Sequence, residues 1–297
     1  MTQRTMQKTL RTLLDTYPVT QAIKSGELGS DLIEFEFANV SRANKGFKPF
    51  VRDLAYDAGE LAIVTFLQAR EAGVPLVLMP ATISGRFQHN CIAYNSDKGV
   101  VRPGDLAGKR IGVRAYTQTT GMWVRGILQN QYGADLDTVE WLTFEDAHVL
   151  GYENPSNVVI APEDKMLDRM LLDGELDAAI LGVDMPDDPR LKTVIPDPDA
   201  AAREWYAQSG AIPMNHMVVV QRDVTRERPD VVRELYRLLK ESKAKIPPKG
   251  SIDFRPYGVE ALRPSLELAI RYCRQQQLLR KDVTVDELFD DVTIALD

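Results

Sequence analysis

The chain has 297 residues, of which 44% are hydrophobic and 27% are charged, and its formal net charge at pH 7 is −7. This length exceeds what one hydrophobic core usually organises, so the sequence predicts two domains of roughly 100–150 residues each. The negative net charge argues against nucleic acid as a partner, because binding phosphates requires a basic face.

The first 18 residues match neither a secretory leader nor a membrane anchor. A leader needs an unbroken apolar stretch of roughly 7–15 residues, and Lys8, Arg11 and Asp15 interrupt every candidate. No other stretch approaches the roughly 20 apolar residues of a membrane span. We therefore expect a cytoplasmic protein with no membrane partner, and a homo-oligomer stays open.

Short β-type segments alternate with helical ones, a pattern typical of parallel sheets covered by helices, so the predicted fold class is α/β. Segment 57–73 is apolar over much of its circumference, which predicts a deeply buried helix. Amphipathic spacing predicts two further helices, around residues 231–239 and 262–273. The predicted strands, in chain order, are residues 10–14, 32–37, 76–79, 110–114, 176–181, 191–195 and 217–220.

The order of these elements predicts that the chain builds one domain, threads a second and returns to the first. A new strand–loop–helix unit begins after Gly104, and the return is expected between Pro213 and Arg222. Domain one would then comprise residues 1–104 and 221–297, and domain two residues 105–220. In such an arrangement a ligand binds between the domains, at the carboxyl ends of the strands.

The most informative polar segment is residues 114–123 (RAYTQTTGMW), which leads from a predicted strand into a helix predicted to begin at Gly121. Arg114 at the strand end offers a bidentate donor for a carboxylate, and the start of a helix attracts anions. In a purely structural alternative, Thr119 and Thr120 only cap the helix. The predicted ligand contacts of this segment are Arg114, Tyr116, Thr117, Thr119 and Thr120.

A similar arrangement is expected ahead of the helix predicted at 57–73. Arg52 and Asp53 come just before it, where backbone donors again point outward, and we expect both to contact the ligand. Asp57 with Glu60 fits an N-terminal cap and its reciprocal glutamate, so these two are expected to be structural.

Three histidines are present, and histidine is the side chain whose unperturbed pKa lies nearest neutrality. His89 lies in a polar loop after the strand 76–79, and His216 opens the last predicted strand. These two are the candidate catalytic residues, whereas His148 lies in an acidic stretch. Arg86, in the same loop as His89, and Asp184, after the strand 176–181, are further candidate ligand contacts.

Several familiar motifs are missing from the sequence. There is no His-x-x-x-His or Cys-x-x-Cys metal spacing, no glycine-rich phosphate loop and no Gly-x-Ser-x-Gly elbow. We therefore expect no metal site and no cofactor. Cys91 and Cys273 both sit in apolar surroundings and are expected to be buried, inert thiols.

Five segments carry a resemblance to a known family. They are residues 50–57 (FVRDLAYD) with 60–62 (ELA), 108–113 (GKRIGV), 119–128 (TTGMWVRGIL) with 132–133 (YG), 216–220 (HMVVV) and 256–264 (PYGVEALRP). Together they resemble the 4,5-dihydroxyphthalate decarboxylase family. The resemblance implies a two-domain type 2 periplasmic binding protein-like fold, with a ligand cleft between the domains, put to enzymatic use.

The resemblance implies a cofactor-independent carboxy-lyase acting on a small hydroxylated aromatic carboxylate. Such a site needs cations for the carboxylate that is kept and a general acid that protonates the ring. Arg52, Arg114 and the helix start would hold the carboxylate, and His89 or His216 would move the proton. A metal held by both histidines and an aspartate stays open.

The alternative function is that of a solute-binding protein of the ABC-transporter type for a small organic anion, without catalysis. The same cleft and the same anion-binding loops serve that function equally well. Because fold alone does not fix function, the sequence leaves both open.

Overall fold

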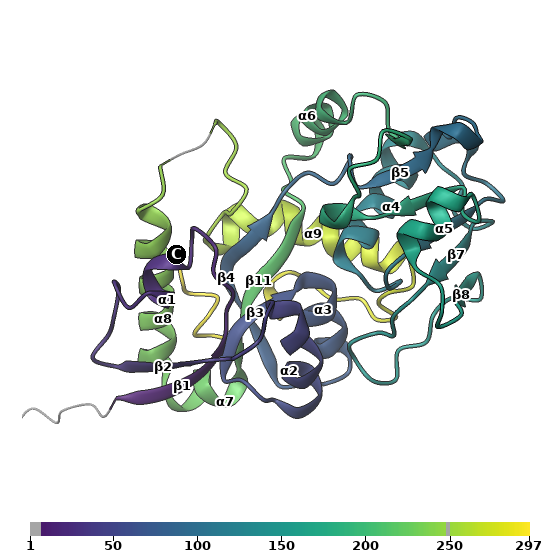
Figure 1. Cartoon of the computed structure of the whole chain (residues 1–297). Helices are drawn as coiled ribbons and strands as arrows, with labels where there is room; N and C mark the ends of the chain where they lie inside the picture. The colour runs from purple at the N-terminus through teal and green to yellow at the C-terminus, as the bar shows by residue number, and fades with distance from the viewer. Residues whose placement is uncertain (1–6, 248–249) are drawn as a thin grey trace, which may run out of the picture. The chain divides into compact units, whose positions relative to one another are not determined.

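The computed structural model describes residues 7–247 and 250–297. They form two compact units, each built around its own sheet (Figure 1). Unit 1 takes in the described residues of Met1–Arg86, Met214–Glu267 and Lys281–Asp297, and unit 2 comprises Phe87–Pro213 and Leu268–Arg280. The α/β class is therefore confirmed, while the domain boundaries at 104/105 and 220/221 stay a prediction.

The sheet of unit 1 has five strands, in the order β2-β1-β3-β11-β4. Strands β2 (Ile33–Phe37), β1 (Lys8–Leu13) and β3 (Ala58–Ala62) run parallel to one another. Strand β11 (Met214–Gln221), where the chain returns from unit 2, is antiparallel to both β3 and β4 (Leu76–Gly85). The sheet is thus mixed, whereas the sequence pattern predicts a parallel sheet.

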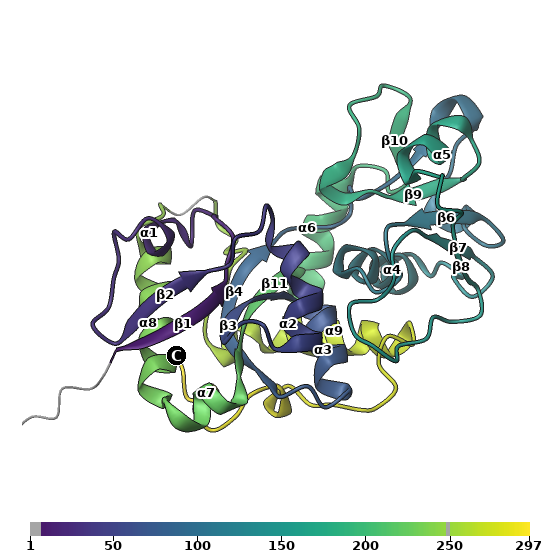
Figure 2. The same cartoon turned by 60° about the horizontal axis from the view of Figure 1, so that its bottom comes forward.

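Helices cover both faces of this sheet (Figures 1 and 2). The amphipathic helix α8 lies on one face, where Val231, Leu235 and Leu239 join a core with Leu10 and Val218. Helices α2 and α3 lie on the other face. The helices of this unit are α1 (Gln21–Lys24), α2 (Phe47–Asp53), α3 (Ile63–Glu71), α7 (Arg222–Glu227) and α8 (Pro229–Ala244), and α9 (Val259–Gln275) is shared between the units.

Segment 57–73 is not the single helix that its composition predicts. Its first part is strand β3, and α3 begins only at Ile63. All five residues of β3 are buried between β1 and β11, so the strand shows no alternation of polar and apolar residues. A short apolar segment of this kind cannot be distinguished from a buried helix by its periodicity.

Two predictions made around this segment are therefore wrong. Asp57 and Glu60 do not cap a helix: Asp57 forms an ion pair with Arg11 at 2.8 Å, and Glu60 lies inside β3. Arg52 and Asp53 do not precede a helix start either. They form the exposed last turn of α2, which ends where Leu54 adopts a left-handed conformation.

The sheet of unit 2 has six strands, in the order β10-β5-β9-β6-β7-β8. The four strands from β9 to β8 are parallel, whereas β5 is antiparallel to β9 and β10 is antiparallel to β5. The strands are β5 (Ile92–Asn95), β6 (Arg110–Val113), β7 (Glu140–Thr143), β8 (Val158–Ile160), β9 (Ala178–Ile180) and β10 (Leu191–Thr193).

Helices α4 and α5 pack on opposite faces of this sheet (Figure 2). A Cβ atom added to Gly112 in β6 would lie 2.3 Å from Leu167 of α5, whereas the next residue, Val113, lies against Gly121 of α4. This alternation is what a strand covered on both faces requires. The helices are α4 (Thr119–Tyr132), α5 (Leu167–Asp173) and α6 (Pro198–Ser209).

Helix α4 begins two residues earlier than predicted. Gln118 occupies the cap position, and Thr119 and Thr120 are the first two helical residues, so neither threonine is the cap.

Cys91 and Cys273 are both buried, as expected. Short 3₁₀ turns complete the fold at η1 (Ala43–Gly46), η2 (Ser96–Lys98), η3 (Pro103–Asp105), η4 (Gly182–Asp184) and η5 (Asp286–Leu288). Within the described residues, no helix combines the length and apolar character that crossing a membrane requires.

Candidate functional site

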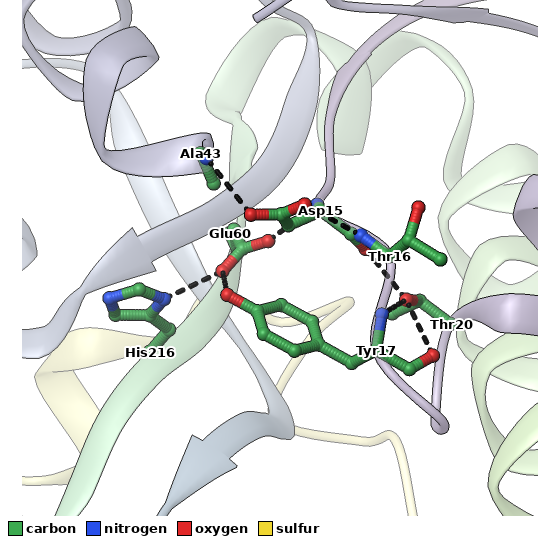
Figure 3. Close-up of polar contacts among 7 residues, drawn as sticks. All are labelled: Asp15, Thr16, Tyr17, Thr20, Ala43, Glu60 and His216. Carbon is green, nitrogen blue, oxygen red and sulfur yellow. Dashed lines mark hydrogen bonds and ion pairs between the residues drawn. The ribbon is translucent and has the colours of Figure 1, made fainter. Parts of the chain in front are cut away.

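A fully buried carboxylate, that of Glu60, lies at the centre of a polar cluster in unit 1 (Figure 3). Its Oε1 accepts a hydrogen bond from the backbone N–H of Asp15 at 2.6 Å. Its Oε2 accepts one from the hydroxyl of Tyr17 at 3.1 Å and lies 2.6 Å from Nδ1 of His216. Three donors from two separate parts of the chain thus converge on one carboxylate, which satisfies a charge that would otherwise be costly to bury.

Strand register explains why these residues meet. Strands β1 and β3 pair in parallel with Leu13 opposite Gly59, which brings the residues after β1 beside Glu60. The strands approach so closely that a Cβ atom on Gly59 would lie 2.2 Å from the carbonyl oxygen of Leu13, so only glycine fits there. On the other side, His216 of β11 pairs with Ala62, two residues from Glu60, and therefore lies diagonally across from the carboxylate on the same face.

The imidazole of His216 is held in one orientation. Since a carboxylate only accepts hydrogen bonds, its contact with Nδ1 places a proton on that nitrogen and fixes the tautomer. The ring of Phe47 packs against it in a T-shaped arrangement, with centroids 5.2 Å apart. Nε2 points away from Glu60 (Figure 3), and the side chain is 22% exposed. This arrangement suits a group that exchanges a proton with a ligand.

The loop after β1 is itself ordered by hydrogen bonds (Figure 3). The backbone N–H of Ala43 donates to Oδ2 of Asp15 at 3.2 Å, and the hydroxyl of Thr20 donates to the carbonyl of Asp15 at 2.7 Å. The same hydroxyl accepts a bond from the N–H of Tyr17 at 2.8 Å. These hydrogen bonds hold in place the two groups of this loop that contact Glu60, the N–H of Asp15 and the side chain of Tyr17.

Burial shifts the pKa of two side chains near Glu60. Burial and the adjacent Glu60 carboxylate raise the pKa of Tyr17 far above its usual range, so the phenol remains a hydrogen-bond donor. Burial lowers the pKa of Lys24, whose Nζ donates to the carbonyl of Leu14 at 2.9 Å and lies 4.2 Å from the ring centroid of Phe37.

The sequence predicted His216 but missed its partners. Asp15 and Tyr17 were detectable as polar residues at the end of a predicted strand. Glu60 was not, because it stands in an apolar segment and matches the spacing of a helix cap. The pairing of residues 60 and 216 depends on a long-range strand contact that no local pattern shows.

A second group of candidates surrounds the turn between β6 and α4 in unit 2. Three polar atoms there are buried without a hydrogen-bond partner among the described residues: Nε of Arg114, Oε1 of Gln118 and Nη1 of Arg125. Nε of Arg114 does lie 3.7 Å from Oε2 of Glu145, which is too far for a hydrogen bond. Buried polar groups are rarely left unsatisfied, so this turn fits a polar ligand.

The other predicted residues of this turn are more enclosed. Thr117, Thr119 and Thr120 are all buried, as is Tyr116. The hydroxyl of Tyr116 donates to the carbonyl of Gln276 at 3.3 Å, so its side chain packs inside unit 2. The role of these four residues in ligand binding stays a prediction.

His89 lies in the interior of unit 2 and is only 1% exposed. Its Nε2 is 3.0 Å from Oε1 of Gln131, and the rings of Phe87 and Trp205 lie against it. Burial lowers the pKa of His89, which keeps the ring neutral. Its catalytic role stays a prediction, and its environment resembles that of a core histidine.

The remaining predicted contacts belong to different elements. Arg52 and Asp53 are exposed on α2, and the partly buried Arg86 is the first residue after β4, all in unit 1. Asp184 is exposed in η4 of unit 2. Their roles stay predictions. Across the described part of the chain, no three histidine, cysteine, aspartate or glutamate side chains gather closely enough to hold a metal ion.

Comparison with known proteins shows which families and proteins this chain resembles in sequence. Residues 55–154 match the model of the family described as NMT1/THI5 like. The chain is 30% identical over 217 residues to a 4,5-dihydroxyphthalate decarboxylase of Comamonas testosteroni, covering 67% of this chain and 63% of that protein. It is 34% identical over 173 residues to one of Pseudomonas putida, covering 54% of this chain and 66% of that protein. The matches thus span just under two thirds of each relative's length.

Among solved structures, the aliphatic sulphonate binding protein SsuA of Escherichia coli superposes with a TM-score of 0.59, at 12% identity and over 95% of this chain and 97% of that one. At such low identity the likeness concerns the fold alone. These matches confirm the resemblance that the motifs predict: the chain is similar to the 4,5-dihydroxyphthalate decarboxylases, and it has a two-domain, periplasmic-binding-protein-like α/β fold.

Proposed function

We propose that this protein is a carboxy-lyase that removes one carboxylate, as carbon dioxide, from a small hydroxylated aromatic acid of the 4,5-dihydroxyphthalate type. The observation that carries the proposal is the pair formed by Nδ1 of His216 and the buried Glu60, 2.6 Å apart. The names of the two relatives support the substrate class.

The reaction needs only proton transfer. A hydroxyl para to the leaving carboxylate directs electron density into the ring, and the carbon that bears the carboxylate takes a proton from Nε2 of His216. The bond to the carboxylate carbon then breaks, its electron pair restores aromaticity, and carbon dioxide leaves. One proton replaces one carboxylate, and solvent returns the proton to His216. The balance requires no oxidant, reductant or organic cofactor.

In this proposal Glu60 acts through His216. Its negative charge stabilises the imidazolium that exists before transfer, and its hydrogen bond holds Nε2 in one direction. The N–H of Asp15 and the hydroxyl of Tyr17 keep the carboxylate in place. The more enclosed His89 is not needed for this step.

We also propose that the β6–α4 turn binds a carboxylate. Arg114 offers a guanidinium at the end of β6, and the 14-residue helix α4 presents the positive end of its dipole at Thr119. The unsatisfied atoms of Arg114 and Gln118 support a polar ligand at this turn. The amide oxygen of Gln118 would accept a hydrogen bond from a ring hydroxyl.

A turnover assay tests the proposal. The purified chain is incubated with a panel of hydroxylated aromatic mono- and dicarboxylates, and carbon dioxide release is followed. We expect release from a para-hydroxylated acid, and we expect His216→Ala to lower kcat by about 100-fold or more with little change in binding. His148→Ala is the matched control and should keep the wild-type rate. A His216→Ala chain with the wild-type rate would refute the proton-transfer assignment.

The second candidate is a solute-binding protein without catalysis. The likeness in fold to a protein named for binding aliphatic sulphonates favours it. Tight binding of a panel member with no carbon dioxide release across the panel would support this function and exclude the first for those acids. The cytoplasmic location expected from the sequence stays a prediction under either function.

A further inference from the structure

Helix α4 carries a buried arginine close behind its first turn. Arg125 is 1% exposed, which makes it one of the largest fully buried side chains in the described chain. Its Nη1 would lie 3.0 Å from a Cβ atom built on Gly121, the third residue of the helix. The guanidinium therefore lies beneath the first turn of α4, inside unit 2.

Within the described chain, the hydrogen bonds and ring contacts of this guanidinium are all with neutral groups. Nε donates to Oε1 of Gln276 at 2.8 Å, and Nη2 donates to the carbonyl of Tyr116 at 2.6 Å. The rings of Tyr116 and Trp141 lie 4.0 and 5.3 Å from its central carbon. Nη1 has no hydrogen-bond partner among the described residues, and the ionisable groups that act on Arg125 there are two tyrosines and a cysteine, with no carboxylate.

Leaving a charge of this kind without a counter-charge is energetically unfavourable. A buried ion normally needs an opposite charge or a full set of hydrogen bonds, since taking it from water costs several kcal/mol. Burial also lowers the pKa of Arg125 from its usual value, although a guanidinium remains charged at neutral pH. The positive end of the α4 dipole lies beside this charge, so both favour an anion at the same place.

We propose that Arg125 is a positioning residue that makes the β6–α4 turn selective for carboxylates over neutral ligands of the same shape. Its positive charge, beneath the first turn of α4, adds to the positive electrostatic potential that the helix dipole creates at the turn. Its hydrogen bond to the carbonyl of Tyr116 fixes the backbone of the turn. The inference rests on the proposed anion binding at this turn and extends it to a residue that does not touch the ligand.

Gln276 offers a way to cancel the charge with little change in shape. Gln276→Glu replaces the amide that accepts the Nε bond with a carboxylate of nearly the same size beside Arg125. It also gives up the hydrogen bond that the amide nitrogen donates to the carbonyl of Met122 at 2.9 Å, and the neutral probe reports any effect of that loss on the turn. Gln275→Glu is the matched control, because it makes the same change one residue earlier, on an exposed side chain of α9.

Calorimetric titration of the full chain with phthalate and with its neutral analogue phthalamide provides the readout. We expect Gln276→Glu to weaken phthalate binding by about tenfold, as expected for one partly screened charge, and to leave phthalamide binding unchanged. Gln275→Glu should bind both probes like the wild type. Loss of fold alone would lower both affinities together, which separates a structural role from the proposed one.

Two variants of Arg125 itself keep the test decisive if Gln276→Glu fails to fold. Arg125→Lys keeps the charge and should keep most of the preference for phthalate over phthalamide, whereas Arg125→Met should lose it. If phthalate binds the wild type, Gln276→Glu and Arg125→Met equally well, the inference is overturned while the proposed function stands. A wild type that binds neither phthalate nor 4,5-dihydroxyphthalate would overturn both.

Discussion

At the scale of single residues, the pair His216 and Glu60 differs from the surface ion pairs of this chain. Arg226 with Asp223 and Arg280 with Glu153 are largely exposed, and pairs of that kind contribute little to stability. Glu60 is fully buried and accepts three hydrogen bonds. Such an arrangement orients one imidazole, which is what a proton-transfer site requires.

Replacing Glu60 with glutamine tests this orienting role. The amide is close to the carboxylate in size, but it lacks the charge that stabilises an imidazolium and it adds N–H groups where donors already converge. We expect Glu60→Gln to lower kcat by about 100-fold with KM changed only a few-fold. Steady-state kinetics measures both, with Glu36→Gln on the exposed edge of β2 as the matched control. A Glu60→Gln variant with the wild-type kcat would contradict the role.

The buried His89 predicts a pH dependence of stability. Burial lowers its pKa in the folded state, so the unfolded chain binds a proton more readily. Acidification below the usual histidine pKa of about 6.5 therefore favours unfolding through this residue. In His89→Leu, the urea midpoint should fall less between pH 8 and pH 5 than in the wild type. His148→Leu, which replaces a histidine that is only partly buried, is the control. If the urea midpoint of His89→Leu fell between pH 8 and pH 5 as much as that of the wild type, unfolding would not be coupled to protonation of His89.

At the scale of elements, the contact between β1 and β3 sets the geometry of the cluster. The N–H of Asp15 reaches Glu60 because the two strands are as close as a glycine allows at Gly59. The cluster thus depends on a backbone contact that lies one residue away from the carboxylate.

Gly59→Ala would force the two strands apart. A Cβ atom there would lie 2.2 Å from the carbonyl oxygen of Leu13, so we expect a loss of roughly 3 kcal/mol or more in the free energy of unfolding. Gly29→Ala is the control, since nothing lies within 4 Å of a Cβ atom at that position. Urea denaturation compares them. A Gly59→Ala chain as stable as Gly29→Ala would mean that the strands do not meet as described.

The elements also show what sequence patterns determine. Helix α8 and strands β1 and β2 follow from their local periodicity, and each appears close to its predicted place. Strand β3 does not, because a strand buried on both faces resembles a buried helix. Because residues 58–62 were predicted to be helical, Glu60 was interpreted as a helix-capping residue and not as the partner of His216.

At the scale of the whole molecule, the alternation of strands and helices sufficed to predict two α/β units, and the motifs sufficed to predict the family. The mixed direction of both sheets could not be predicted, because it depends on where the chain returns through β11 and on how β5 and β10 pair. The candidate site could be predicted only in part. Its histidine and the β6–α4 turn have local signals, whereas the contact between residues 60 and 216 depends on the folded sheet.

The most direct test of the proposed decarboxylation follows the proton itself. A single turnover of 4,5-dihydroxyphthalate in heavy water, with the wild type and with His216→Ala, measures carbon dioxide release and deuterium at the vacated ring carbon. We expect one carbon dioxide and one deuterium per substrate for the wild type, and the same binding with a rate lower by about 100-fold for the variant. Equal rates for both proteins, or binding by the wild type with no carbon dioxide released, would contradict it.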